Sequence, residues 1–178
     1  MDSQINNVIR ISGYHLRNIA FLRKYLDEDS VKKLICNCVI SRLDYCNSIY
    51  YSLPNFKLRK LQNIKNRAAR LIKGVVHRDR VTLVLTELHW LPIKARIKFK
   101  ICVLTHQAIT TGKPAYLNKL LVIMQPTEGV DTRSNTDGRK LIEPRCSSNI
   151  GFRAFASAAS RLQYLTIRNK NVRQSCFV

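Results

Sequence analysis

Acidic residues are scarce in this chain of 178 residues, which holds 11 aspartates and glutamates against 31 lysines and arginines. Hydrolytic and metal-dependent enzymes draw many of their acids, bases and metal ligands from carboxylates. The few carboxylates present must also cap helices and balance charge, so the composition disfavours catalysis of this kind. The formal net charge of +20 favours an anionic partner, and nucleic acid is the commonest one.

A membrane-spanning run, a secretory leader and a phosphate-binding glycine loop are also missing. No apolar run approaches the ~20 residues that a spanning helix needs, and the first 16 residues are polar and mixed. We therefore expect a nuclear or cytoplasmic protein, neither secreted nor membrane-bound, whose six cysteines are reduced. A hydrophobic content of 46% is enough for a packed core.

The cysteines and histidines form no recognisable catalytic or metal-binding pattern. Cys36, Cys38 and Cys46 lack the second ligand pair of a typical zinc site, and packing as small apolar residues is favoured. Cys102 and His106 are one helical turn apart, but no acid is placed to orient the histidine, so core packing is again favoured. We expect no catalytic residue, metal ligand or cofactor in this chain.

Helical periodicity dominates the first 121 residues and predicts a mainly α fold, a helical bundle. The acidic run 27–29 is interpreted as helix capping, with Asp29 or Ser30 as an N-cap, rather than as a metal site. Gly74 is the expected stop of one helix and Pro92 the expected start of another. The expected helices are about 4–26, 31 to just before Pro54, 56–73, 92–111 and 114–121. Residues 81–88 are also expected to be helical, with a strand as the alternative because of their valine and threonine content.

The remaining residues, 122–178, predict an irregular module. Turn-forming residues indicate a long loop over 122–138, and 140–145 is compatible with a short strand. An alanine-rich helix follows at 151–162, and the last dozen residues are expected to fray. We therefore expect a helical domain over 1–121 and a module over 122–178 with one helix, a frayed tail and at most a short β-hairpin.

Basic charge is concentrated between Lys57 and Lys100, where 13 lysines and arginines face only two carboxylates, a net of +11. The 56–73 helix is amphipathic, and Lys65 lies near its apolar stripe, where it is expected to snorkel. The 92–111 helix carries two apolar stripes on nearly opposite sides, which predicts that it lies between two layers. Trp90 is interpreted as a core anchor, with base stacking as the alternative.

Such dense like charge favours contact with phosphates over a merely solvated surface. This binding is expected to be salt-sensitive and largely independent of sequence. The predicted contacts are the polar residues on the outer sides of these two helices: Arg59, Asn63, Asn66, Arg67, Arg70, Lys73, Lys94, Arg96, Lys98 and Lys100.

Several stretches in fixed order resemble one protein family. They read Ser41-Arg42-Leu43-Asp44-Tyr45-Cys46-Asn47-Ser48 with Leu53-Pro54, then Leu61-Gln62 and Asn66-Arg67-Ala68-Ala69-Arg70-Leu71-Ile72, then Glu87-Leu88-His89-Trp90-Leu91-Pro92-Ile93 with Arg96-Ile97-Lys98-Phe99-Lys100. From about residue 6 to 162 the chain resembles the C-terminal part of the reverse transcriptase polyprotein of LINE-type (non-LTR) retrotransposons, of the jockey and chicken-repeat kind.

The resemblance implies that residues 1–121 form a thumb-like domain that contacts a template–primer duplex, RNA–DNA or DNA, beside a palm domain that this chain lacks. The palm would hold the polymerase active site and its Mg²⁺, and no Asp-Asp pair occurs here. Arg161-Leu162 is followed by Gln163-Tyr164, where the family reads Trp-Asn, which fits a degraded or truncated copy.

The expected function is therefore that of a non-catalytic fragment of an RNA-directed DNA polymerase. The alternative is a helical protein-interaction module with basic faces and no nucleic-acid role. The sequence predicts no oligomeric state.

Overall fold

The computed structural model describes residues 2–75, 79–124, 141–148 and 151–168. This part of the chain is mainly helical and holds no β-sheet, so the predicted fold class is confirmed. The chain divides into two compact units, residues 1–97 and 98–178. The boundary thus falls within a long helix, whereas the sequence placed it after residue 121. Most of the expected 122–138 loop and the expected frayed tail lie outside the described residues.

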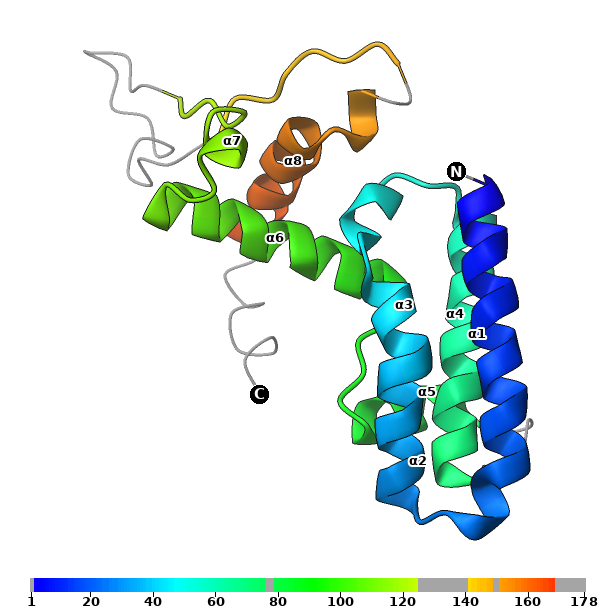
Figure 1. The fold of residues 1–178 in the computed structure, drawn as a ribbon. Coiled ribbons are helices and arrows are strands. Elements are labelled where there is room, and N and C mark those ends of the chain that lie inside the picture. The colour runs from blue at the N-terminus through cyan, green and yellow to red at the C-terminus, as the bar shows by residue number, and fades with distance from the viewer. Residues whose placement is uncertain (1, 76–78, 125–140, 149–150, 169–178) are drawn as a thin grey trace. The chain divides into compact units, whose positions relative to one another are not determined.

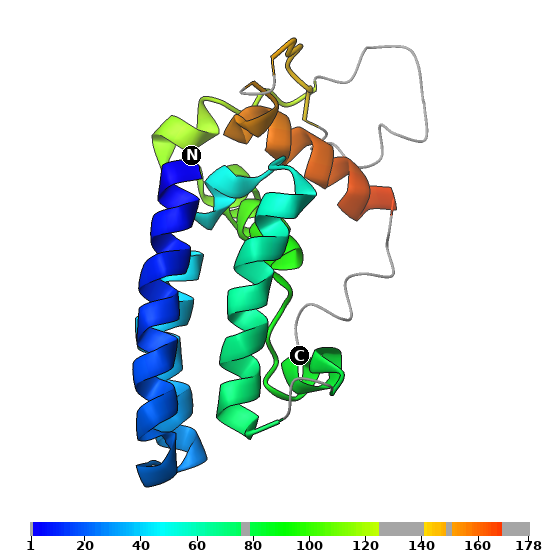
Figure 2. The same ribbon diagram turned by 90° about the vertical axis from the view of Figure 1, so that its right-hand side faces the viewer.

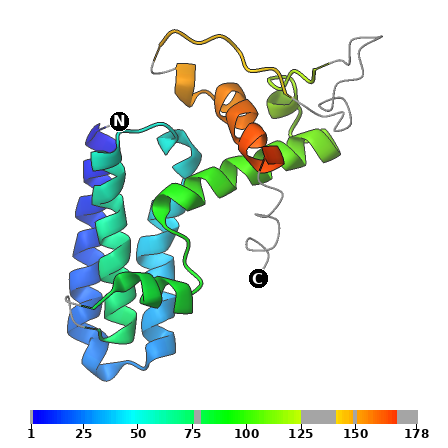
Figure 3. The ribbon, with the colours of Figure 1, turned by 180° about the vertical axis from the view of Figure 1, so that it is seen from behind.

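Three helical segments lie side by side in the first unit (Figures 1 and 2). They are α1 (Asp2–Leu22), the succession of α2 (Glu28–Ile35), a π-helical turn (Cys36–Ile40) and α3 (Ser41–Asp44), and α4 (Asn55–Lys73). A shorter helix, α5 (Val81–Glu87), packs against α4 (Figure 3). Aliphatic side chains at helical spacing fill the space between the segments, among them Ile5, Leu16, Val31, Ile35, Val39, Leu61 and Ile72.

The second helical segment begins and ends earlier than the sequence predicted. Its N-cap is Asp27, whose carboxylate accepts a hydrogen bond of 3.2 Å from the backbone N–H of Ser30, so the expected cap at Asp29 or Ser30 is wrong. Hydrogen bonding by the Ser30 side chain and by this backbone N–H lowers the pKa of Asp27. The segment ends at Asp44 rather than just before Pro54, because Tyr45 is extended and Cys46 has a φ of 51°.

Both ends of α4 agree with the prediction. The helix begins directly after Pro54 and ends at Gly74, whose φ of 66° is the left-handed conformation that glycine adopts without strain. Arg23, in the 3-10 turn after α1, donates hydrogen bonds of 3.2 Å to the carbonyls of Leu71 and Ile72. It thereby satisfies carbonyls in the last turn of α4 that lack helical partners.

The long helix α6 (Ile93–Thr111) begins directly after Pro92, as predicted. One of its two apolar stripes is buried, including Ile93, Ile97 and Ile101. The other is less buried, since Phe99 is 37% exposed and Cys102 and Ile109 are half-buried. None of the described helices has a stretch long and apolar enough to cross a membrane.

The second unit continues with α7 (Ala115–Asn118), a 3-10 turn (Gly151–Arg153) and α8 (Phe155–Arg168). In place of the strand expected at 140–145, the described residues show an isolated antiparallel bridge between Ile123 and Leu141. Arg161 on α8 holds Glu143 at 2.5 Å and lies 4.5 Å from the ring centroid of Phe152. An ion pair and a cation–π contact therefore join this helix to the two segments before it.

Candidate nucleic-acid interface

Helix α4 carries seven lysines and arginines and no carboxylate in its 19 residues. Its apolar positions recur every three or four residues and face the core, among them Leu61, Ile64, Ala68 and Ile72. The structure separates the seven cations according to their surroundings. Some project into solvent, one is half-buried, two are paired with acids of other helices, and one is buried.

The outward row consists of Arg59, Asn63 and Arg67, which are exposed and follow one another at intervals of four residues. At 1.5 Å per residue, this row is about 12 Å long. Lys60 is exposed beside it. These four side chains have no ion pair within the part of the chain that the structure describes. Three of the predicted contacts thus share one accessible face, and we call Arg59, Asn63 and Arg67 the α4 row.

Arg70 and Asn66 border this row and are half-buried. Arg70 Nε is buried without a hydrogen-bond partner among the described residues. Asn66 Oδ1 accepts a hydrogen bond of 2.7 Å from Gln62 Nε2, so its amide is already engaged within the helix. Both residues are therefore less available to an outside ligand than the row itself.

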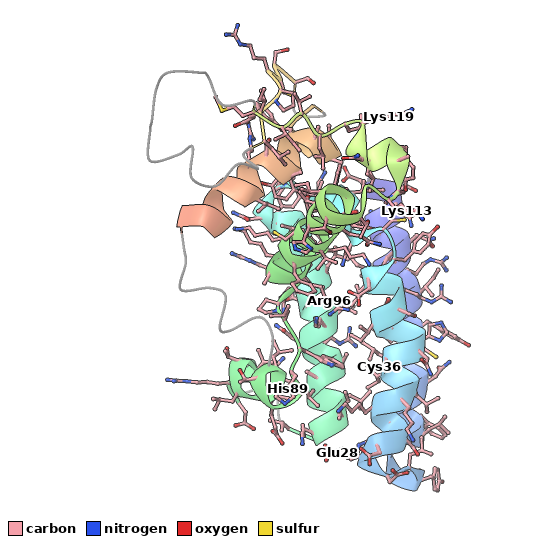
Figure 4. All side chains as sticks on the ribbon, turned by 90° about the vertical axis from the view of Figure 1, so that its left-hand side faces the viewer. Glu28, Cys36, His89, Arg96, Lys113 and Lys119 are labelled. Carbon is pink, nitrogen blue, oxygen red and sulfur yellow. The ribbon has the colours of Figure 1, made fainter. Side chains whose placement is uncertain are left out.

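Lys73 occupies a different environment from the rest of the predicted contacts. Its Nζ lies 2.7 Å from Glu28 Oε1 and 2.5 Å from Glu87 Oε1, and thus links α4 to α2 and α5. The two hydrogen-bonded carboxylates raise the pKa of Lys73, and the bond to Lys73 lowers the pKa of Glu28. Figure 4 labels Glu28 at the start of α2. The charge of Lys73 is compensated within the molecule, which leaves it outside the free cationic surface.

The sequence predicted that the Lys65 side chain extends to the surface, and this prediction is wrong. The residue is 2% exposed, and its Nζ donates a hydrogen bond of 2.6 Å to the carbonyl oxygen of Leu91. The same Nζ lies 5.6 Å from the ring centroid of Trp90, in a cation–π contact. Removal from water lowers the pKa of Lys65 to about 8, a change that nearby Asp44 partly opposes.

The start of α6 is fixed by further polar contacts within the first unit. Arg96 holds Asp44 through two bonds, Nε to Oδ1 at 2.6 Å and Nη2 to Oδ2 at 2.5 Å. The backbone N–H of Ile93 donates to Gln62 Oε1 at 2.8 Å. Arg96, which Figure 4 labels near the start of α6, is therefore neutralised by an internal carboxylate. Lys94, its neighbour on the helix, is exposed.

We call this set of contacts the Lys65 cluster; its members are Asp44, Gln62, Lys65, Trp90, Leu91, Ile93 and Arg96. All but Lys65 come from the stretches that carry the family resemblance. Sequence reasoning missed the cluster, because its hydrogen-bonded partners lie 26 to 52 residues apart in the chain. One signal was available: Gln62 and Lys65 are polar residues at or beside the apolar stripe of an amphipathic helix. Trp90 is half-buried against Lys65 rather than freely exposed, which fits its interpretation as an anchor.

The last two predicted contacts, Lys98 and Lys100, belong to the second unit. Lys100 is exposed and Lys98 is half-buried. Helix α6 has no carboxylate along its whole length, so no acid of the same helix compensates these charges.

Two further observations on the described residues concern metal binding and catalysis. Among the described residues, no three His, Cys, Asp or Glu side chains come together as a metal ion requires. A pocket of about 370 Å³ between α1 and α3 has no carboxylate, histidine or cysteine in its lining and so offers no such side chain as a general base. Its lining residues are Gln4, Asn7, Val8, Ile11, Ser41, Arg42 and Tyr45.

Comparison of the chain with models of protein families, with curated proteins and with solved structures gives no match.

Proposed function

We propose that this chain is a non-catalytic, nucleic-acid-binding part of a LINE-type RNA-directed DNA polymerase, which contacts a template–primer duplex through its basic helices. The observation that carries the proposal is the α4 row with Lys60, where exposed cations lie on a helix without a single carboxylate. Such a face repels other cations and attracts a polyanion, whose condensed counterions are released on contact. The order of the sequence stretches described above supports the same assignment.

The chemistry of the α4 row suits phosphates rather than base edges. Arginine presents several donors in a rigid planar fork that matches a phosphate group, and the amide of Asn63 adds a donor between Arg59 and Arg67. A convex helix face about 12 Å long contacts successive phosphates along one strand without reading the sequence. In the proposed parent protein, catalysis and its Mg²⁺ belong to the palm domain, and the chain acts in the nucleus or cytoplasm.

Titration of the full chain with a short RNA–DNA hybrid at several salt concentrations tests the proposal. Replacing Arg59→Gln and Arg67→Gln together removes two exposed charges from the row. The affinity is expected to fall, and the slope of log K against log[salt] is expected to become shallower by about two, since each phosphate contact contributes about 0.9. Fluorescence anisotropy measures both quantities.

The matched control replaces Lys32→Gln and Lys33→Gln, two exposed lysines of α2, and removes the same net charge from another helix. This control is expected to keep the wild-type slope. Equal slopes for wild type and the α4 variant would contradict the proposal. Equal losses of affinity in the α4 variant and the control would also contradict the proposal, because they would show that binding depends on net charge and not on a particular face.

A further inference from the structure

Helix α1 presents a row of large aromatic side chains to solvent. Tyr14 is 55% exposed, and Phe21 and Tyr25, at the end of the helix and in the turn after it, are each 71% exposed. At 100° per residue, Tyr14 and Phe21 point away from the buried positions of the helix, such as Ser12 and Leu16. Single exposed apolar residues are common on protein surfaces, whereas an aligned set of them is typical of a surface that binds a ligand or a partner.

Cations accompany these aromatic residues at regular spacing. Arg10 precedes Tyr14 by four residues, and Arg17 precedes Phe21 by four, so each cation lies one helical turn from a ring. Lys24 completes the series seven residues after Arg17, with its Nζ 5.4 Å from the ring centroid of Phe21 and 4.7 Å from that of Tyr25. We call Arg10, Tyr14, Arg17, Phe21, Lys24 and Tyr25 the α1 row.

No carboxylate of the same helix balances this charge. The single acid of α1 is Asp2, which is 2.5 Å from Lys57 of α4. Of the acidic run 27–29 that follows the turn, Asp27 caps α2, Glu28 binds Lys73, and Asp29 is exposed in the first turn of α2. A second protein placed on the α1 row would have to supply its own acids between apolar groups. A polynucleotide offers both features in one repeating unit, a flat base and a phosphate.

We infer that the α1 row is a binding site for single-stranded nucleic acid, in which unpaired bases stack on the rings and phosphates contact the neighbouring cations. Stacking on exposed rings requires bases that are not already stacked in a duplex. Tyr14 and Phe21 are about 10 Å apart along the helix axis, which allows separate bases to occupy them. This site goes beyond the duplex-binding function, since it uses a different helix and a different form of the polymer.

The test uses the full chain with single-stranded probes of about 16 nucleotides, one oligoadenylate RNA and its DNA equivalent, and with the RNA–DNA hybrid. Replacing Tyr14→Ala, Phe21→Ala and Tyr25→Ala together removes the rings and keeps every charge. We expect at least a fivefold weaker affinity for both single strands, because each lost stacking contact changes affinity by about 5- to 150-fold. Affinity for the hybrid is expected to stay within twofold of wild type.

A ring-preserving variant, Tyr14→Phe with Phe21→Tyr and Tyr25→Phe, serves as the matched control and is expected to bind single strands within twofold of wild type. The Arg59→Gln and Arg67→Gln variant is expected to show the opposite selectivity, weaker on the hybrid and little changed on single strands. Failure of the duplex proposal and failure of this inference therefore give different results. Thermal melting by circular dichroism checks that the alanine variant folds.

Three results would overturn the inference. In the first, the alanine variant binds single strands as tightly as wild type does. In the second, the variant loses affinity for RNA alone, although RNA and DNA offer the same adenine base. In the third case, ultracentrifugation would show that wild type self-associates through this row and that the alanine variant is monomeric, which makes the row a protein interface. Ultraviolet crosslinking that places a bound base on Tyr14, Phe21 or Tyr25 would support the inference directly.

Discussion

Replacing Lys65→Met tests the burial of the Lys65 ammonium group. Methionine has a similar length and no charge, so it occupies the same space and removes the titrating group. In the folded chain the pKa of Lys65 is about 8, whereas its ordinary value is 10.5. Between these two values the unfolded chain binds more protons than the folded one. The free energy of unfolding must therefore rise with pH in this window, and the penalty for burying the charge is fully present below pH 8.

The size of the effect follows from the two pKa values. They differ by roughly 2.5 pH units, and each unit corresponds to about 1.4 kcal/mol. The measured quantity is the difference in unfolding free energy between wild type and the Lys65→Met variant. Compared with its value at pH 7, this difference is expected to shift in favour of wild type by about 1 kcal/mol at pH 9 and by about 2 to 3 kcal/mol at pH 10. Burial also raises the pKa of Tyr50, and ion pairing raises that of Lys73; both groups are present in both proteins and cancel in the difference.

Urea unfolding followed by circular dichroism, in a reducing buffer at pH 7, 8, 9 and 10, gives the required free energies. Lys60→Met is the matched control, since it makes the same substitution at an exposed position of α4 and is expected to keep the wild-type pH profile. Parallel profiles for wild type and Lys65→Met would refute the reasoning. They would mean that Lys65 titrates near its ordinary pKa and that its Nζ reaches water.

Two further predictions concern the stability of the first unit. Asp44→Asn removes the charge that holds Arg96. Because the Arg96 side chain is 41% exposed, we expect the free energy of unfolding to fall by about 1 to 2 kcal/mol, less than for a fully buried pair. Urea titration measures this loss, and the control, Asp29→Asn at an exposed position, is expected to change stability by less than about 0.5 kcal/mol. Gly74→Ala is expected to lower the free energy of unfolding by about 1 kcal/mol, since alanine is strained at a φ of 66°. Gly13→Ala is expected to raise it by about 0.5 to 1 kcal/mol, because Gly13 lies inside α1 with open space around a new Cβ. Opposite shifts in Tm would confirm the glycine pair, and equal shifts would contradict it.

The parts of the fold that the sequence predicted well are those controlled by local physics. Helix α4 is an example, because a stripe of aliphatic residues sets its inner face and Gly74 sets its end. The expected cap at Asp29 or Ser30 failed for a local reason too. Asp27 also meets the requirement of an N-cap, and a sequence pattern does not rank adjacent candidates.

The candidate site was harder to predict because the state of a charge depends on residues far along the chain. Lys73 and Arg96 look like their exposed neighbours in the sequence, yet carboxylates from other helices neutralise both. Lys65 lies beside an apolar stripe, and its hydrogen-bond acceptor is the backbone carbonyl oxygen of Leu91. A pattern of side chains cannot predict such a backbone acceptor. Counting charge locates a basic helix, and only the fold shows which of its cations are free.

The stretches that resemble the polymerase family have a physical explanation that does not involve nucleic acid. Asp44, Gln62 and Trp90 fix the start of α6 against α3 and α4 through the Lys65 cluster. Arg59 takes no part in these contacts, so the capacity to bind a polyanion is separable from the capacity to fold. A variant that keeps the cluster and loses the α4 row should fold normally and bind weakly. Substitutions within the cluster should reduce both properties, because a disordered α4 no longer presents its cations on one face.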